Sequence, residues 1–422
     1  MKRKCLALIL SAMLTLTAFS GQVFACTGSA DGLTNCLEPE TVPGGGESAL
    51  PHWEAGRLLD ADGAPVSGWY NEDGRWYLLD ETGAPRTGWQ QLDDKWYYLD
   101  NSGVMLDGWQ SLGNNWYLFS GGAMKTGWAK SGGKWYYFGS DGAMKTGWLS
   151  LGDKKYYLTA SGAMKTGSIT DGSTVYTLSS SGAVSSSTNL SSISNKSYGW
   201  GPGTQVDSLN RPLSALSYQE KFGSRGGVFI GQNEKVIYLT FDEGYENGYT
   251  APILDTLKQK GVSATFFITG AYLKSEPELV ERMINEGHTV GNHTVNHPNL
   301  PSISIAKRDS EIGGLHRQME EKFGYTMYLM RPPEGVFSEQ LLSQAQGMGY
   351  RTVLWSYAYK DWDVNNQMAP ASALQKAVSA LHPGAVYLLH AVSKTNAAML
   401  GDLIDQARAK GYTFAILDRS GV

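Results

Sequence analysis

The sequence predicts a multidomain protein, with an N-terminal β-hairpin solenoid of about five repeats and a C-terminal α/β domain built on a parallel sheet or barrel. Three observations support this fold class. Gly-Trp pairs recur every 19 or 20 residues in the first half, a Ser-rich stretch follows at 179–197, and β-prone runs alternate with helix-like runs beyond Lys235. A chain of 422 residues is long enough for two or three domains.

The first residues have the pattern of a secretory signal peptide, predicted here as residues 1–25. A basic start at 2–4 precedes an apolar stretch at 5–19 and a small-residue cleavage pattern at 23–25. The apolar stretch is too short for a permanent membrane helix, which needs roughly twenty residues. We therefore predict a secreted protein with no membrane span in the mature chain.

Cleavage would leave Cys26 and Cys36 in a leader at 26–47. In an oxidising compartment these two cysteines could form a disulfide. Lipidation of Cys26 and two unpaired thiols are the alternatives, although the bulky Phe24 fits a lipoprotein pattern poorly.

Composition bounds the class of protein. Hydrophobic residues make up 41% of the chain and charged residues 18%, as in a globular protein. The formal net charge is −5 and no basic cluster stands out, so we predict no nucleic-acid partner.

The repeats begin near residue 68. The Gly-Trp tryptophans are followed seven residues later by a second tryptophan in the first four units; the two series are Trp69, Trp89, Trp109, Trp128, Trp148 and Trp76, Trp96, Trp116, Trp135. So short a period indicates an array of supersecondary units, none of which can bury its own apolar face. Within a unit, Trp-Tyr-Tyr-Leu is β-prone and Asp/Ser-Gly favours a turn, so each unit is predicted to be a short hairpin.

These units resemble the cell-wall-binding repeats of choline-binding proteins over roughly residues 48–187. The resemblance implies aromatic cages between neighbouring hairpins, formed by the nine tryptophans above. These cages would bind the quaternary ammonium group of choline, or a glycan. It also implies a methionine beside each cage, at Met105, Met124, Met144 and Met164. Packing of one repeat on the next is the alternative role of the aromatics. Lys155 replaces the second tryptophan of the fifth unit and the following unit lacks both, which argues against a complete cage in these two.

A Ser-rich linker at 188–200 is predicted to precede the second domain, 201–422. Six of the seven histidines lie beyond it, so the titratable chemistry belongs to the C-terminal half. The β-prone runs there are 236–241, 264–268, 288–291, 328–331, 352–355, 385–389 and 413–417, and the helix-like runs are 251–260, 277–286, 306–323, 339–347, 371–381 and 396–409. This alternation predicts a parallel sheet or barrel with functional groups at the carboxyl ends of its strands.

Candidate metal ligands fall at two of these strand ends. His293 and His297 are four residues apart, and both rings could reach one ion if the segment turns helically. Asp242 and Glu243 supply a carboxylate at another strand end. Such a set leaves room for a metal-bound water that attacks an acyl carbon, provided that another group takes its proton.

Five ordered motifs, TFDEG, GNHTVNHP, RPPEG, KDWD and VYLLH, resemble those of the NodB-homology polysaccharide deacetylases from about Ser197 to the C-terminus. The resemblance implies a distorted (β/α) barrel with fewer than eight repeats. It also implies metal-dependent hydrolysis of an N-acetyl group on an amino sugar. The metal would be divalent, with zinc the expected ion, and held by Glu243, His293 and His297.

The same resemblance assigns the catalytic roles. Asp242 would be the general base, paired with Arg331. His390, oriented by Asp361, would protonate the leaving amine, and the backbone N–H of Glu334 would stabilise the oxyanion together with the metal. A turn or cap role for Asp361 and a core role for His390 are the alternatives when each residue is taken alone.

Further stretches, including YLTFDEGYENGYTAPILDTL and PGAVYLLHAVSKTNA, resemble the peptidoglycan N-acetylmuramic acid deacetylases that prepare muramic δ-lactam in spore cortex. The implied partners are peptidoglycan glycan strands, with choline-bearing or glycan wall polymers on the repeats. Glu243 stands where the family has Asp or Asn, and Ala358 where other branches have Asp. A general peptidoglycan N-acetylglucosamine or chitin-oligomer deacetylase and a catalytically weak wall-binding protein therefore remain as alternatives.

Overall fold

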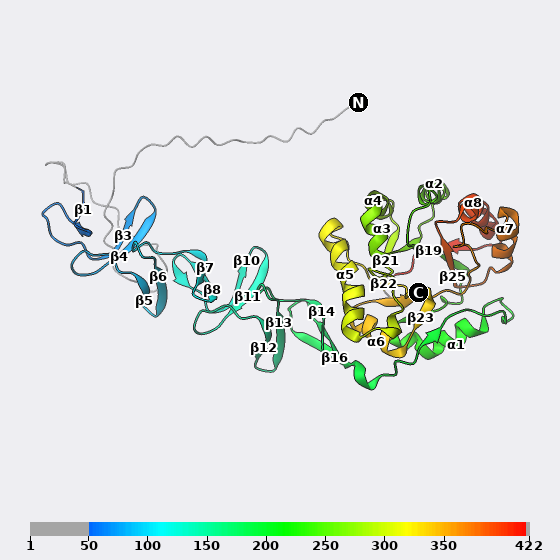
Figure 1. Cartoon of the computed structure of the whole chain (residues 1–422), viewed down its shortest axis with the longest axis horizontal. Coiled ribbons are helices and arrows are strands. Elements are labelled where there is room, and N and C mark those ends of the chain that lie inside the picture. Colours follow the sequence, from blue (N-terminus) through cyan, green and yellow to red (C-terminus); the bar gives the residue numbers. More distant parts are fainter. Residues whose placement is uncertain (1–49, 419–422) are drawn as a thin grey trace, which may run out of the picture. The chain divides into compact units, whose positions relative to one another are not determined.

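The structure is a computed structural model that describes residues 50–418 (Figure 1). The predicted signal peptide and the two leader cysteines lie outside these residues. Within them, no helix is long and apolar enough to cross a membrane. The chain forms two compact units, one reaching Gly147 and including Leu158–Met164, the other comprising Trp148–Tyr157 and the chain from Lys165 onward.

The repeats fold as antiparallel hairpins, as predicted, and Ala123–Met124 adds a third strand to one of them. In one of them Glu72 pairs with Arg75, so that Asp73 and Gly74 form the two-residue loop. Both loop residues have positive φ, at 50° and 82°, a turn conformation that Asp-Gly favours. The strands are β1 His52–Glu54, β2 Arg57–Leu59, β3 Gly68–Glu72, β4 Arg75–Leu79, β5 Gly88–Leu92, β6 Lys95–Leu99, β7 Gly108–Leu112, β8 Asn115–Ser120, β9 Ala123–Met124, β10 Gly127–Ser131, β11 Lys134–Phe138, β12 Gly147–Leu151 and β13 Lys154–Leu158.

The repeat methionines pack one unit on the next. A Cβ added at Gly122 would lie 2.2 Å from Sδ of Met105, and the turn glycines of the two following units meet Met124 and Met144 in the same way. Because these glycines also have positive φ, substitution there would both strain the turn and push the methionine aside.

The second unit contains an eight-stranded parallel sheet. Its order is β18 (Gly227–Val228), β24 (Arg351–Val353), β22 (Leu329–Met330), β21 (Thr289–Asn292), β20 (Thr265–Ile268), β19 (Val236–Glu243) and β25 (Ala385–His390), with β26 (Thr413–Phe414) beside β19. The segment after β24 forms a further parallel bridge to β25, from Tyr357 to Tyr387. The sheet therefore curls toward closure, which confirms the distorted (β/α) barrel.

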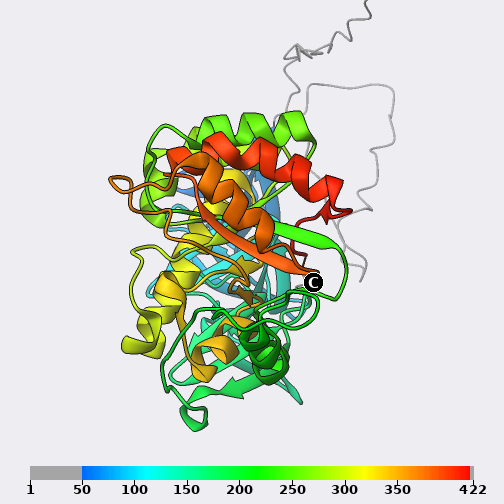
Figure 2. The same cartoon turned by 90° about the vertical axis from the view of Figure 1, so that its right-hand side faces the viewer.

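Helices cover the outside of this sheet, and Figure 2 shows α2 and α8 side by side. The predicted helical runs are confirmed, whereas α1 and α3 were not predicted. The helices are α1 Leu213–Phe222, α2 Thr250–Lys260, α3 Gly270–Ser275, α4 Pro277–Asn285, α5 Ile305–Phe323, α6 Glu339–Gly347, α7 Pro370–Ser379 and α8 Lys394–Ala409. A short antiparallel pair, β17 (Tyr198–Gly199) with β23 (Val336–Phe337), joins the start of the domain to the barrel.

Strand β19 shows how the core places the site. Leu239 and Phe241 belong to the cluster beneath the helices, and Phe241 stacks on Phe266 at 5.1 Å. Tyr238 instead packs against the cluster inside the barrel. Since successive residues of a strand face opposite sides, Asp242 shares the inner side with Tyr238, and Glu243 shares the helix side with Phe241.

The Ser-rich stretch, predicted to act as a linker, is ordered against the barrel. Residues 184–189 form strand β16 (Val184–Asn189), which extends the hairpin of β14 (Gly167–Asp171) and β15 (Thr174–Leu178). Leu190 is buried and its carbonyl accepts from Nε2 of Gln340 in α6 at 2.8 Å. The domain boundaries themselves stay predictions.

Candidate active site

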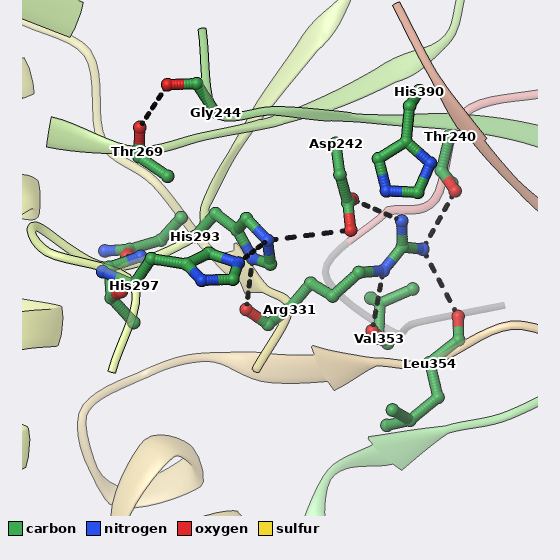
Figure 3. A network of polar contacts seen from close by, with 12 residues as sticks. Thr240, Asp242, Gly244, Thr269, His293, His297, Arg331, Val353, Leu354 and His390 are labelled. Carbon is green, nitrogen blue, oxygen red and sulfur yellow. Dashed lines mark hydrogen bonds and ion pairs between the residues drawn. The ribbon is translucent and has the colours of Figure 1, made fainter. Parts of the chain in front are cut away.

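Asp242 lies at the carboxyl end of β19 and is held by one arginine (Figure 3). Nη1 of Arg331 donates to Oδ1 of Asp242 at 2.7 Å. The guanidinium is fully buried and also donates to Oγ1 of Thr240 at 2.8 Å and to the carbonyls of Val353 and Leu354 at 3.1 and 3.3 Å. Every part of the planar fork thus has an acceptor, which fixes the carboxylate.

The charges around Asp242 decide its protonation state. Burial raises the pKa of its carboxyl, but the positive charge of Arg331 and the neighbouring His293 and His390 lower it, and the net pKa lies below its ordinary value. Asp242 is therefore ionised near neutral pH. Its second oxygen, Oδ2, is the one available to take a proton.

The two predicted histidines come together beside this oxygen. Nε2 of His293 lies 3.2 Å from Nε2 of His297 and 3.6 Å from Oδ2 of Asp242. The prediction of a helical turn between the two histidines is wrong, because the segment is a loop in which Thr294 and His297 have φ of 70° and 54°. Two left-handed residues reverse the chain and bring the rings together.

A carboxylate outside the motifs fixes that loop. Glu311 in α5 is buried and accepts from the backbone N–H and from Nδ2 of Asn296, both at 2.9 Å. Burial raises the pKa of Glu311, but these hydrogen bonds and Lys307 outweigh it and the net pKa is lowered. The position of Glu311 in a helical run did not indicate this role in the sequence.

Glu243 does not join the histidines. It is fully buried on the helix side of β19, and neither carboxyl oxygen has a hydrogen-bond partner in the described structure. Burial, with the charges of Glu246 and Asp242, raises its pKa well above the ordinary value. Strand alternation thus separates a predicted metal ligand from the other two.

The histidine pair fits a divalent ion in part. Nδ1 of His293 lies 2.8 Å from the carbonyl of Arg331 and donates to it, so Nε2 presents its lone pair. Burial lowers the pKa of His293 to about 4, which keeps the ring neutral and able to ligate. Two imidazole nitrogens therefore suit a metal, whereas among residues 50–418 no three His, Cys, Asp or Glu side chains gather as a metal-binding group.

His390 and Asp361 form the second half of the site. His390 is the register partner of Asp242 on the adjacent parallel strand, so both side chains project from the same side. Oδ1 of Asp361 lies 2.7 Å from Nδ1 of His390, and Oδ2 accepts the backbone N–H of His390 at 2.8 Å. Nδ2 of Asn396 donates to the same Oδ2 at 2.5 Å, and its Oδ1 accepts from the hydroxyl of Tyr359 at 2.5 Å.

This environment favours the protonated imidazole. Burial lowers the pKa of His390, but the hydrogen bond and charge of Asp361 and the charge of Asp242 outweigh it, and the net pKa is raised. A base and an acid with opposed pKa shifts thus stand on neighbouring strand ends, as general acid–base catalysis requires.

Glu334 lies in the turn that follows Arg331. It has a left-handed backbone, with φ of 60°, and non-glycine residues held in this region cluster at functional sites. The next residue, Gly335, also has positive φ, and a Cβ there would lie 2.5 Å from the Trp355 ring. The oxyanion role of the Glu334 N–H stays a prediction.

The repeat tryptophans form three-membered aromatic sites. In the first, the Trp69 ring lies 6.4 Å from Trp76 and 5.1 Å from Tyr97 of the next unit. Two further sets have the same geometry, namely Trp89, Trp96, Tyr117 and Trp109, Trp116, Tyr136. Trp116 and Trp135 remain 48% and 43% exposed, more than packing alone requires. In later units Trp128 contacts Tyr137 and Trp148 contacts Tyr176.

Comparison with known proteins agrees with both halves of the chain. The polysaccharide deacetylase family matches residues 230–353, the choline-binding repeat matches 125–169, and the cell wall binding repeat matches 67–84 and 87–105. The peptidoglycan-N-acetylmuramic acid deacetylase PdaA of Bacillus subtilis is 46% identical over 242 residues, which are 56% of this chain and 90% of that protein. The chain belongs to the polysaccharide deacetylase family.

The deacetylase also resembles more distant relatives and a solved structure. The peptidoglycan-N-acetylglucosamine deacetylase PgdA of Listeria monocytogenes is 34% identical over 44% of this chain and 39% of that protein. The structure of Bacillus subtilis PdaA, a family 4 carbohydrate esterase, superposes with a TM-score of 0.51 at 38% identity, covering 54% of this chain and 97% of that one. The chain is accordingly a hydrolase acting on carbon–nitrogen bonds other than peptide bonds, in a family that is generally metal-dependent.

When Asp361 is replaced by Asn, the alkaline loss of deacetylase activity should begin at a lower pH than in the wild type. His390 must carry a proton to act as the acid, and the charge of Asp361 raises its pKa. Removing that charge should move the alkaline limb of the kcat/KM profile down by about one to three pH units. Asp363→Asn, a nearby change on a half-buried carboxylate that pairs with Lys360, should leave the profile unchanged. An unmoved limb in Asp361→Asn would exclude His390 as the acid.

Proposed function

We propose that this chain is a peptidoglycan deacetylase that hydrolyses the N-acetyl group of N-acetylmuramic acid, and that its repeats retain it at the cell wall. One observation carries the hydrolytic part. Asp242, kept ionised by Arg331, and His390, kept protonated by Asp361, are register partners at the open end of the barrel.

The proposed reaction needs one proton acceptor and one proton donor. Oδ2 of Asp242 takes the proton of a water whose oxygen attacks the acetyl carbonyl, while the N–H of Glu334 binds the developing oxyanion. His390 then protonates the amine nitrogen as the carbon–nitrogen bond breaks, which yields acetate and the free amine. A divalent ion, for which we propose zinc, would bind at His293 and His297 and supply Lewis acidity. Metal analysis of the purified protein, and activity with a chelator, test that assignment.

A groove beside His297 supports an acidic sugar as the substrate. It has a volume of about 670 Å³ and runs past Tyr245 and Lys274; the remaining lining residues are Gly244, Thr269, Gly270, Ala271, Val295, Asn296 and Gln318. None of the described residues that line it is acidic. Tyr245 is 52% exposed and offers a ring face for a sugar.

Lys274 is the feature that suits muramic acid. This sugar differs from glucosamine by a lactyl ether, whose carboxylate is exposed once the stem peptide has been removed. An ammonium group in a groove without acids favours such a carboxylate over a neutral sugar. The similarity to an N-acetylmuramic acid deacetylase points the same way, and we propose that the released amine leads toward muramic δ-lactam in spore cortex.

The aromatic sites support the proposed attachment to the wall. Aromatic faces bind quaternary ammonium groups, and three complete sites recur along the array. Choline-bearing or glycan polymers are therefore the proposed partners of the repeats, and the proposed location of the enzyme is outside the cell, at the wall.

Substrate profiling tests the proposal. Purified protein should release acetate from muramic residues of denuded glycan, measured with reduced muropeptides and chitooligosaccharides in parallel. Acetate released only from N-acetylglucosamine residues would instead support the general peptidoglycan or chitin-oligomer deacetylase.

Lys274→Met should lower kcat/KM on denuded muramic glycan about fivefold, because Lys274 is exposed and an exposed ion pair contributes at most about 1 kcal/mol. Activity on chitooligosaccharides should be unchanged. Lys274→Arg should retain the muramic activity, and Lys376→Met, on the exposed face of α7, serves as the matched control. Equal losses on both substrates would contradict the assignment of Lys274 to the lactyl carboxylate.

A further inference from the structure

The fifth aromatic site of the array differs from the complete ones in a single member. Two of its three members are present, since the Trp148 ring lies 4.6 Å from the Tyr176 ring with an interplanar angle of 64°. The corresponding pair in the first unit, Trp69 with Tyr97, lies at 5.1 Å and 64°. The site therefore keeps its shape although Lys155 stands where the earlier units have their second tryptophan.

Lys155 does not leave the position of the missing tryptophan empty, because its ammonium group lies against the rings of Trp148 and Tyr176. Nζ is 4.0 Å from the centroid of Trp148 and 5.1 Å from that of Tyr176. Both distances are within the roughly 6 Å over which a cation is attracted to an aromatic face. The charge thus occupies the place that a bound quaternary ammonium group would take.

The surroundings hold this arrangement in place. Nε1 of Trp148 donates to Oδ2 of Asp171 at 2.8 Å, which fixes the indole plane across to β14. The Tyr157 ring lies 5.1 Å from the same indole ring. Lys155 itself is half-buried and forms none of the ion pairs found among the described residues, so the rings are its electrostatic partners.

We propose that the fifth aromatic site is occupied by the chain's own Lys155 ammonium, which closes it to quaternary ammonium groups of the wall and fixes the hairpin β12–β13 on the next hairpin, β14–β15. The site is thereby converted from ligand binding to joining two hairpins. The inference rests on the proposed binding of quaternary ammonium groups by the complete sites.

The hairpin β14–β15 shows why such a connection would be useful. Val175, at the position of the second tryptophan, is buried, and a Cβ added at Gly347 of α6 would lie 2.7 Å from its Cγ1. Oγ1 of Thr170 donates to Oδ1 of Asp309 in α5 at 2.6 Å. This hairpin is thus used to contact the barrel, and the occupied site attaches the preceding hairpin to it.

The test measures the number of choline molecules bound by the full chain. Lys155→Trp should bind one more choline per chain than the wild type in equilibrium dialysis, because it restores the third ring and removes the internal cation. Lys155→Met keeps the length of the side chain without its charge. It should lower the midpoint of thermal unfolding, and saturating choline should raise that midpoint more than in the wild type. Lys154→Met, the adjacent exposed lysine on the same strand, should change neither quantity.

The outcomes separate this inference from the proposed function. If the wild type binds no choline, the proposed ligand of the array fails, and a lower midpoint in Lys155→Met than in Lys154→Met would still support the internal cation. If the wild type binds choline but Lys155→Trp adds no site and Lys155→Met is as stable as the control, the inference is overturned.

Discussion

Asp242→Asn is expected to lower kcat for acetate release about 10²- to 10⁴-fold, the usual contribution of a general base. Asn has nearly the shape of Asp, and its amide oxygen can still accept from Nη1 of Arg331, which now lies 2.7 Å from the carboxylate. The fold should therefore persist while the proton acceptor is lost. The measurement is acetate release from denuded glycan under saturating substrate.

Asp255→Asn is the matched control for this change, since Asp255 is an exposed carboxylate of α2 paired with Arg282. It should have full activity. If Asp242→Asn retained full acetate release, another group would be the base and the proposed mechanism would be wrong.

Arg331→Met should destabilise the chain by about 3–5 kcal/mol, as expected when one partner of a buried ion pair is removed. The methionine replaces much of the volume but leaves the Asp242 carboxylate buried without its cation. The hydroxyl of Thr240 and the carbonyls of Val353 and Leu354 also lose their donor. Urea unfolding monitored by far-UV circular dichroism would measure the loss.

A double mutant separates the charge from the packing. Because Asp242→Asn removes the charge that Arg331 neutralises, Arg331→Met should cost about 1–3 kcal/mol less in that background than in the wild type. Equal costs in both backgrounds would show that the arginine acts through its carbonyl contacts alone.

Residues whose chemistry depends on strand ends were predictable from the sequence. Asp242 and His390 each end an apolar run, and parallel strands bring their carboxyl ends to one side of a sheet. That rule places both residues at one edge of the sheet, whereas their pairing on adjacent strands is seen only in the structure.

The face of the neighbouring residue was harder to predict. Asp242 and Glu243 are adjacent, and the prediction placed both at the site, but inside a continuing strand only one can face the barrel interior. The motif shows that two acidic residues are present, but it does not show at which residue β19 ends. The structure extends β19 through Glu243.

Supporting residues were missed for a different reason. Glu311 lies in the middle of α5 and Asn396 near the start of α8, where polar residues are common on exposed faces. Both are buried here because a loop from elsewhere in the chain folds over them. Contacts between residues so far apart in sequence leave no periodic signal.

The ordered Ser-rich segment limits the distance between the barrel and its nearest repeat. A flexible chain of the 19 residues at 179–197 would have a root-mean-square span of about 24 Å. In the structure, Nε2 of Gln340 donates to the carbonyl of Leu190, and Oγ of Ser338 donates to Oδ1 of Asn195 at 2.7 Å. The hairpin β14–β15 and the barrel are therefore held together by these contacts. The distance over which the active site can reach along a glycan then depends on where the repeats are attached, and not on the span of a flexible linker.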